Sequence, residues 1–217
     1  MNRFRSKGVL SPLLALLLAL AGALPVLFAQ APQRKQGRRP AANKASQSPR
    51  PRLVLLIVVD QFRYDYLSRF GDLFGSRGVG RLMREGATWT EANFDHVPTF
   101  TAPGHAVFMT GASPSQTGIV ANEWYERETG RKVKSITDDS TIMLAGKPNE
   151  KGKGPRRLLC STVGDELRLA YGDRSKVIGI SSKDRSAILP AGRRANGAYW
   201  FSTDNGNIIS STYYFDH

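Results

Sequence analysis

The run LVLLIVVD, from Leu53 to Asp60, constrains the fold of this chain more than any other feature. It is continuously apolar and rich in β-branched residues, which is typical of a strand buried on both faces of a mostly parallel sheet. Further signals alternate along the chain. They predict helices over 61–70 and 80–86, a helix through Leu159, Val163, Leu167 and Ala170, a strand over 176–181, and hairpin turns at 128–130 and 204–207. This alternation predicts an α/β fold.

The N-terminal region divides into two segments that precede the folded part. Residues 1–31 place basic residues before a long apolar run that ends in small residues, and this pattern predicts a secretory signal peptide. Because the apolar run approaches the roughly 20 residues of a spanning helix, an uncleaved N-terminal anchor is the alternative. Residues 32–52 are basic and Pro-rich without aromatic or branched aliphatic side chains, so we predict a disordered tether. Residues 53–217 are then long enough for one domain of ordinary size.

The charge of the chain is concentrated at its N-terminus. Residues 1–52 hold ten of the 31 Lys and Arg residues and none of the 18 Asp and Glu residues, so the remainder has a net charge of only +3. This distribution argues against specific nucleic-acid binding by the folded part. It leaves open a non-catalytic exported protein that binds anionic surfaces through its tether. The single cysteine, Cys160, cannot form an internal disulfide, which favours the bacterial periplasm or cell surface.

Polar residues follow the two predicted strands of this domain. Asp60 ends the first strand, and Lys183, Asp184 and Arg185 follow the second. Because ligands of open α/β sheets bind beyond the carboxyl ends of strands, we expect these residues to converge on one edge. On position alone, Asp60 could equally cap a following helix.

Thr101 precedes Pro103 and an apolar stretch, as at the start of a helix. A phosphoryl group is favoured at such a position, where a threonine hydroxyl could act as nucleophile; a capping role is the alternative. We expect His105, four residues on, to pack or to form a hydrogen bond. A serine-hydrolase elbow is excluded, because the segment from Gly111 to Ser115 lacks the final glycine and carries Pro114 after its serine.

Three segments occur in one order and resemble the alkaline phosphatase superfamily: VVDQFRYDYL, VPTFTAPGHAVFMTGASPSQTGIVANEWY and SSKDRSAILPAG. Within it they resemble the threonine-nucleophile, phosphate-irrepressible periplasmic enzymes, which are related to type I phosphodiesterase/nucleotide pyrophosphatases. The resemblance implies a three-layer α/β fold whose central, largely parallel sheet lies between helices. That fold would be incomplete at the C-terminus of this chain.

The resemblance also implies roles for particular residues. Asp60 would be a zinc ligand, and Thr101 would be both the nucleophile and a zinc-bound oxygen. Asn122, Lys183 and Arg185 would contact the transferred phosphoryl group, and the Lys-x-Arg pair resembles the monoesterase branch. A complete site would hold two Zn²⁺ ions, whose other ligands lie downstream of this pair in the family.

The resulting expectation is zinc-dependent hydrolysis of small-molecule phosphate monoesters through a phosphothreonine intermediate. The alternative on the same scaffold is a phosphodiesterase or nucleotide pyrophosphatase. We expect a monomer that meets the membrane only through its signal segment. Since the chain stops at His217, before the remaining ligands, we expect it to be an inactive fragment of the enzyme.

Overall fold

The computed structural model describes residues 51–147 and 150–215, and the chain divides into two compact units, Met1–Ile57 and Val58–His217. The predicted signal peptide (1–31) and all but the last two residues of the predicted tether (32–52) lie outside the described residues. Throughout the described part of the chain, no helix has the length and apolar character needed to cross a membrane.

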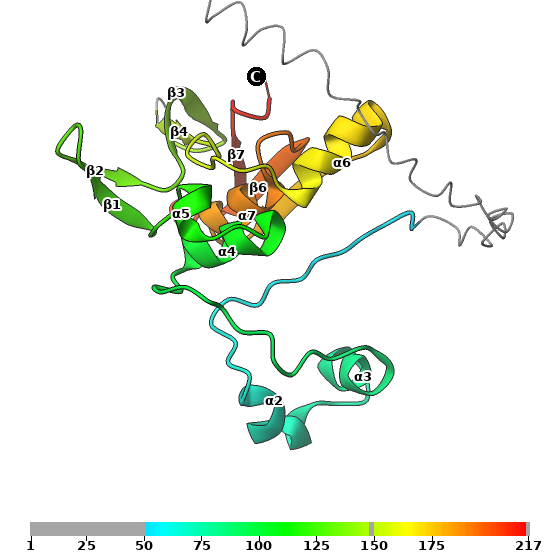
Figure 1. Ribbon diagram of the computed structural model, residues 1–217. Coiled ribbons are helices and arrows are strands. Elements are labelled where there is room, and N and C mark those ends of the chain that lie inside the picture. Colours follow the sequence, from blue (N-terminus) through cyan, green and yellow to red (C-terminus); the bar gives the residue numbers. More distant parts are fainter. Residues whose placement is uncertain (1–50, 148–149, 216–217) are drawn as a thin grey trace, which may run out of the picture. The chain divides into compact units, whose positions relative to one another are not determined.

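Figure 1 labels most of the helices and strands of the second unit. The helices are α2 (Tyr66–Arg69), α3 (Gly78–Glu85), α4 (Thr101–Thr110), α5 (Pro114–Thr117), α6 (Val163–Tyr171) and α7 (Asp184–Ala191), with short 3₁₀ helices η1 (Gly71–Leu73) and η2 (Gly172–Arg174). The strands are β1 (Glu123–Glu126), β2 (Arg131–Lys134), β3 (Thr137–Leu144), β4 (Lys151–Lys153), β5 (Ile178–Ser181), β6 (Gly197–Phe201) and β7 (Ile208–Ser211).

Five strands form a mixed sheet in the order β4-β3-β7-β6-β5, and β1 and β2 form a separate hairpin. The β5–β6 pair is parallel and the other pairs are antiparallel. This arrangement confirms the α/β class and both predicted hairpins, with Trp124 opposite Val133 and Trp200 opposite Ile209. The described sheet is mixed rather than largely parallel, because short turns such as the one between β6 and β7 can join only antiparallel neighbours.

The core of this unit lies where α7 packs between α4 and the parallel pair β5–β6 (Figure 1). Its fully buried side chains include Ala102 and Ala106 of α4 and Ile188 and Leu189 of α7. On the sheet side, Trp200 of β6 is 2% exposed. Burial of these side chains fixes α4 and α7, whose first turns carry Thr101 and Arg185, against one another.

Local signals explain where the main helices begin and end. Helix α4 has Pro103 in its first turn and ends at Gly111, whose φ of 63° lies in the left-handed region. Helix α6 starts after Thr162, whose side chain accepts from the Asp165 amide in a buried capping box. This cap explains why Leu159 lies outside the helix that its spacing predicted.

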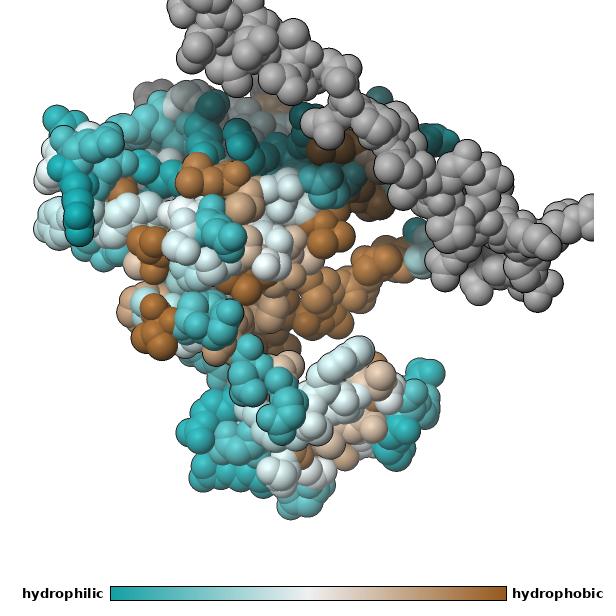
Figure 2. All heavy atoms as spheres, in the orientation of Figure 1, coloured by the Kyte–Doolittle hydropathy of each residue, from teal (hydrophilic) through white to brown (hydrophobic). Residues whose placement is uncertain are grey.

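The predicted strand from Leu53 to Asp60 is wrong for the described structure. These residues form no strand, and Leu53 is 80% exposed and Val59 is 62% exposed. A buried parallel strand needs partners along its edges, and none of the paired strands includes this segment. In Figure 2 the segment's side chains are among those coloured as hydrophobic.

The two helices predicted to follow are present but short. Helix α2 begins at Tyr66 instead of residue 61, since Gln61 has a φ of 62°, outside the right-handed helical region. Helix α3 covers most of the segment predicted near Gly80. Neither helix contains a buried residue.

Candidate active site

Thr101 is the first residue of α4 and is only 8% exposed. Its Oγ1 hydroxyl donates a hydrogen bond to Oδ2 of Asp60 at 3.0 Å. The helix cap is Phe100, and no side chain caps the helix. The capping alternative is therefore excluded for Thr101. Asp60 likewise caps no helix, because α2 begins six residues after it and its N-cap is Asp65.

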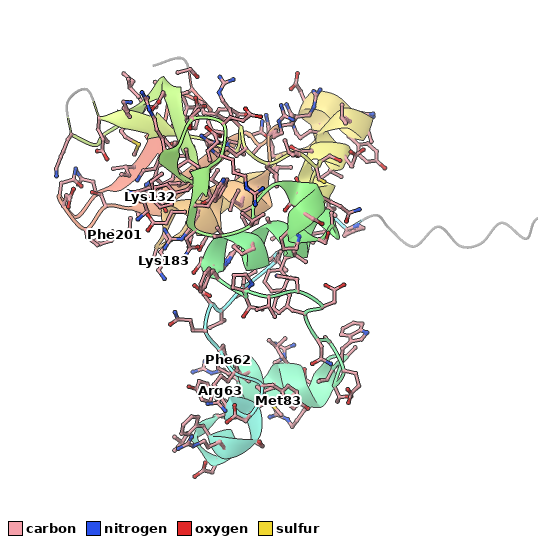
Figure 3. All side chains as sticks on the ribbon, turned by 60° about the vertical axis from the view of Figure 1, so that its left-hand side comes forward. Phe62, Arg63, Met83, Lys132, Lys183 and Phe201 are labelled. Carbon is pink, nitrogen blue, oxygen red and sulfur yellow. The ribbon has the colours of Figure 1, made fainter. Side chains whose placement is uncertain are left out.

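Lys183 and Asn122 lie beside Thr101 and Asp60. The Nζ of Lys183 lies 3.7 Å from Oδ2 of Asp60, the same oxygen that accepts from Thr101. The Oδ1 of Asn122 accepts a hydrogen bond of 2.9 Å from the backbone amide of Ala102, the residue after Thr101. Asp60 and Lys183 are thus brought together as predicted, but not on one edge of a sheet, because Asp60 follows no strand. Figure 3 labels Lys183 in the unit that carries the sheet.

Arg185 lies in the first turn of α7 beside Asp184. Its Nη1 is 3.5 Å from Oδ1 of Asp184, and its backbone amide donates to the same oxygen at 2.7 Å. The Nε of Arg185 is buried and finds no hydrogen-bond partner in the described structure. Since buried guanidinium donors are normally satisfied, this nitrogen is a donor that the described residues leave free.

A pocket of about 460 Å³ joins Asn122 and Arg185. Phe100, Ser135 and Thr137 contribute to its wall, and so do the charged side chains of Glu123, Lys134, Lys153 and Asp184. The size suits a small-molecule ligand. Around β1–β4 the molecular surface is mainly hydrophilic (Figure 2), in keeping with the charged lining of this pocket.

Charge within the pocket acts on Glu123. The pKa of Glu123 lies below its ordinary value, first because Lys132 donates a hydrogen bond to its carboxylate at 2.5 Å and then because Lys132, Lys134 and Arg185 are positively charged. Glu123 is thus held as an anion in the wall of the pocket. It offsets part of the positive charge of the lysines and arginine.

The metal-binding prediction rests on Asp60 and Thr101. Their side-chain oxygens lie 3.0 Å apart, close enough for both to coordinate one cation at the roughly 2.0–2.2 Å of zinc–oxygen bonds. Over residues 51–147 and 150–215, no group of three or more His, Cys, Asp or Glu side chains is arranged to hold a metal ion. The described residues therefore fit a partial site with two oxygen ligands.

His105 is buried, and its Nδ1 lies 2.8 Å from the carbonyl oxygen of Thr101. This contact agrees with the packing and hydrogen-bonding role predicted for it. Sequence reasoning did not find Lys153 of β4. Its Nζ lies 2.8 Å from Oδ2 of Asp184, which comes 31 residues later in the chain. No local pattern distinguishes Lys153 from the other basic residues around it, so only the fold identifies it.

Comparison with known proteins relates this site to a family. Residues 54–215 match the model of the type I phosphodiesterase / nucleotide pyrophosphatase family. The chain is 42% identical over 193 residues to alkaline phosphatase PhoV of Synechococcus elongatus, covering 88% of this chain and 35% of PhoV. It is 43% identical over 174 residues to alkaline phosphatase PafA of Elizabethkingia meningoseptica, covering 80% of this chain and 32% of PafA.

The fold is also similar to that of PafA. The crystal structure of wild-type PafA matches with a TM-score of 0.71 and 42% identity, covering 74% of this chain and 31% of PafA. A structure of a PafA variant in which a threonine, an asparagine, a lysine and an arginine are substituted has the same TM-score of 0.71. The chain spans about a third of the length of the curated relatives it matches. The match over residues 54–215 and the similarity to alkaline phosphatases confirm the predicted resemblance, and the chain belongs to the type I phosphodiesterase/nucleotide pyrophosphatase family.

Proposed function

We propose that the whole protein hydrolyses small-molecule phosphate monoesters, with Thr101 as the nucleophile. The observation that carries this proposal is the convergence of Thr101, Asp60 and Lys183, whose side-chain atoms meet at one carboxylate oxygen within 3.0 and 3.7 Å. The relatives named alkaline phosphatase support the same reaction class.

The PafA variant supports the choice of residues. Its substituted threonine and asparagine are 21 positions apart and its substituted lysine and arginine are two apart. Thr101 and Asn122, and Lys183 and Arg185, have the same spacings in this chain. We therefore propose these four residues as the catalytic set.

Each residue has a task that its contacts support. The hydroxyl oxygen of Thr101 forms a bond to phosphorus while the bond to the leaving-group oxygen breaks, and water then hydrolyses the phosphothreonine. The amide of Asn122 is oriented by its bond to Ala102, which leaves its NH₂ group to donate to a phosphoryl oxygen. Lys183 and Arg185 supply positive charge to the remaining oxygens of the dianion.

We propose that the complete site binds two Zn²⁺ ions, with Asp60 and Thr101 among the ligands. Zinc would stabilise the deprotonated form of a hydroxyl that is otherwise a poor nucleophile. Asp60 orients the Thr101 hydroxyl through their hydrogen bond.

Phosphodiester hydrolysis is the second candidate, because the matching family model describes phosphodiesterases and pyrophosphatases. The presence of both Lys183 and Arg185 favours the monoester, which brings one more negative charge than a diester. A diester has one phosphoryl oxygen blocked by its second substituent.

An activity assay on the full-length gene product separates the two candidates. We expect faster hydrolysis of an aryl phosphate than of a bis-aryl phosphate, loss of activity with EDTA and recovery with Zn²⁺. Thr101→Ala should abolish turnover, whereas Thr129→Ala, an exposed threonine of the β1–β2 turn, should not. Preference for the diester, or unchanged monoester hydrolysis in Lys183→Ala and Arg185→Ala, would contradict the monoesterase proposal.

We further propose that the protein is exported to the periplasm or cell surface, on the basis of the signal-like residues 1–31 and the single cysteine. Cell fractionation against a periplasmic marker tests the location. Deletion of residues 32–52 tests the non-catalytic alternative, which requires salt-sensitive binding that is lost with the tether.

A further inference from the structure

Asp184 lies between the two proposed phosphoryl-binding cations in sequence and contacts two basic residues. Its Oδ1 accepts the Arg185 amide at 2.7 Å and lies 3.5 Å from Nη1 of the same residue. Its Oδ2 lies 2.8 Å from the Nζ of Lys153, which comes from β4. The carboxylate is thus shared between Lys153 and Arg185, one oxygen to each.

The ion pair between Lys153 and Asp184 is less exposed than the neighbouring pair between Lys151 and Asp139. The side chain of Lys153 is 28% exposed and that of Asp184 is 19% exposed, whereas the pair formed by Lys151 and Asp139 is 73% and 66% exposed. The Nζ of Lys153 also lies 5.9 Å from the ring centroid of Trp200, which is buried in β6. A partly buried ion pair is less screened by water and salt than an exposed one, so this contact constrains Asp184.

The division of the carboxylate has a consequence for Arg185. A carboxylate and a guanidinium prefer a pair of parallel hydrogen bonds, which would engage both oxygens of Asp184. Here Lys153 contacts Oδ2 and the Arg185 amide donates to Oδ1, while the guanidinium of Arg185 makes only a 3.5 Å contact with Oδ1 and its buried Nε is unpaired in the described structure. The guanidinium therefore keeps donors for an anion in the pocket that it lines with Asn122.

We infer that Lys153 is a positioning residue: by neutralising Asp184, it keeps the guanidinium of Arg185 directed toward the phosphoryl group instead of toward Asp184. This inference rests on the proposed phosphatase function. Without Lys153, Asp184 would bind Arg185 through both oxygens and reduce its contact with substrate.

The test uses the full-length protein with an aryl phosphate as substrate and inorganic phosphate as competitive inhibitor. Lys153→Met should lower kcat/KM by about 10- to 100-fold, as displacement of an orienting group does, and should weaken inhibition by phosphate. Lys153→Arg should retain most of the activity. Lys151→Met, two residues away in β4, is the matched control and should leave both values unchanged.

A second substitution distinguishes positioning from a structural role. Asp184→Asn removes the carboxylate that competes for Arg185, so the double variant Lys153→Met/Asp184→Asn should recover activity relative to Lys153→Met alone. Loss of packing would not be repaired in this way. In an Arg185→Ala background, Lys153→Met should have no further effect. Lys153→Gln replaces Lys153→Met in all comparisons if the methionine variant does not fold.

The outcomes separate this inference from the proposed function. If Arg185→Ala leaves hydrolysis of the aryl phosphate unchanged, the proposed role of Arg185 fails. If Arg185→Ala lowers kcat/KM but Lys153→Met does not, the positioning role is wrong. It is also wrong if Asp184→Asn fails to restore kcat/KM in the Lys153→Met background. The same holds if the decreases in kcat/KM caused by Lys153→Met and Arg185→Ala add in the double variant.

Discussion

Gly179, in the middle of β5, is the position where a single methyl group should disturb both the core and the site. A Cβ at this position would overlap the carbonyl oxygen of Ala187 and would lie 3.0 Å from both the carbonyl carbon of Ala187 and the Cβ of Ala191. Non-bonded heavy atoms are most favourable at roughly 3.5–4.0 Å. Because the obstructing atoms include the backbone of α7, they cannot turn aside as a flexible side chain would, and we expect Gly179→Ala to push α7 away from β5.

The expected cost follows from overpacking of a buried contact, which is about 1–3 kcal/mol. A clash with backbone belongs at the upper end, so we expect a loss of about 3 kcal/mol in the free energy of unfolding. For a chain of this size, that corresponds to a decrease in Tm of roughly 6–12 °C. Urea denaturation followed by tryptophan fluorescence measures the loss. Gly71→Ala is the control, because a Cβ at Gly71 would meet no atom within 4 Å.

The same displacement should reach the site, since α7 begins at Asp184 and carries Arg185 in its first turn. In the full-length protein, Gly179→Ala should therefore lower kcat/KM for an aryl phosphate by at least about tenfold at a temperature where the variant remains folded. If the free energy of unfolding of Gly179→Ala lies within about 0.5 kcal/mol of that of the parent protein, the close approach of α7 to β5 does not constrain the fold as argued.

Two further predictions concern buried polar groups. Tyr214 has a buried hydroxyl without a hydrogen-bond partner in the described structure, so Tyr214→Phe should stabilise the protein by about 1 kcal/mol at neutral pH in urea denaturation. Burial raises the pKa of Tyr214 well above its ordinary value of 10.0, so the unfolded chain loses this proton first. The contribution of Tyr214 to stability should therefore be constant below about pH 10 and fall as the pH rises further, and Tyr214→Phe should lack this fall. Asp165 is 2% exposed and accepts from the amides of Thr162 and Arg194 at 2.9 and 2.5 Å, so Asp165→Ala should cost about 3 kcal/mol by thermal denaturation. The exposed Asp173→Ala should cost almost nothing; an equal loss in both variants would contradict the capping argument.

The elements that sequence predicted well are those specified by neighbouring residues. The β1–β2 and β6–β7 hairpins follow from turn residues between apolar runs, and α4 follows from Pro103 in its first turn and the apolar stretch after it. Strand β5 was predicted over 176–181 and spans Ile178–Ser181. In each case the signal and the structure lie within about ten residues, and no distant contact is needed to interpret the pattern.

The elements that sequence predicted poorly depend on distant partners. The run from Leu53 to Asp60 has the composition of a buried strand, but composition does not provide the neighbouring strands with which it must pair. Lys153 is similar: its relation to Asp184 exists only because β4 is folded against β3 and brought to the first turn of α7. For the candidate site, the resemblance specified residues individually; the structure brings Asp60 together with Thr101 and Lys183, and the catalytic roles stay predictions.

The contact between Asp60 and Thr101 joins residues that are distant in sequence, so its stability depends on more than the hydrogen bond between them. The residues are 41 positions apart, and closing a flexible loop of that length costs about 3 kcal/mol by the logarithmic dependence on loop length. A hydrogen bond to a charged group contributes only about 1.5–3 kcal/mol, and the intervening helices α2 and α3 bury no residue that would add to it. The hydrogen bond alone therefore barely offsets closure, and Asp60 needs further interactions to stay beside Thr101. Lys183, at 3.7 Å from the same carboxylate, provides one of them. A divalent cation bound by both oxygens would provide another, because ligand binding to the folded arrangement stabilises it, so ordering of Asp60 and metal binding should be coupled.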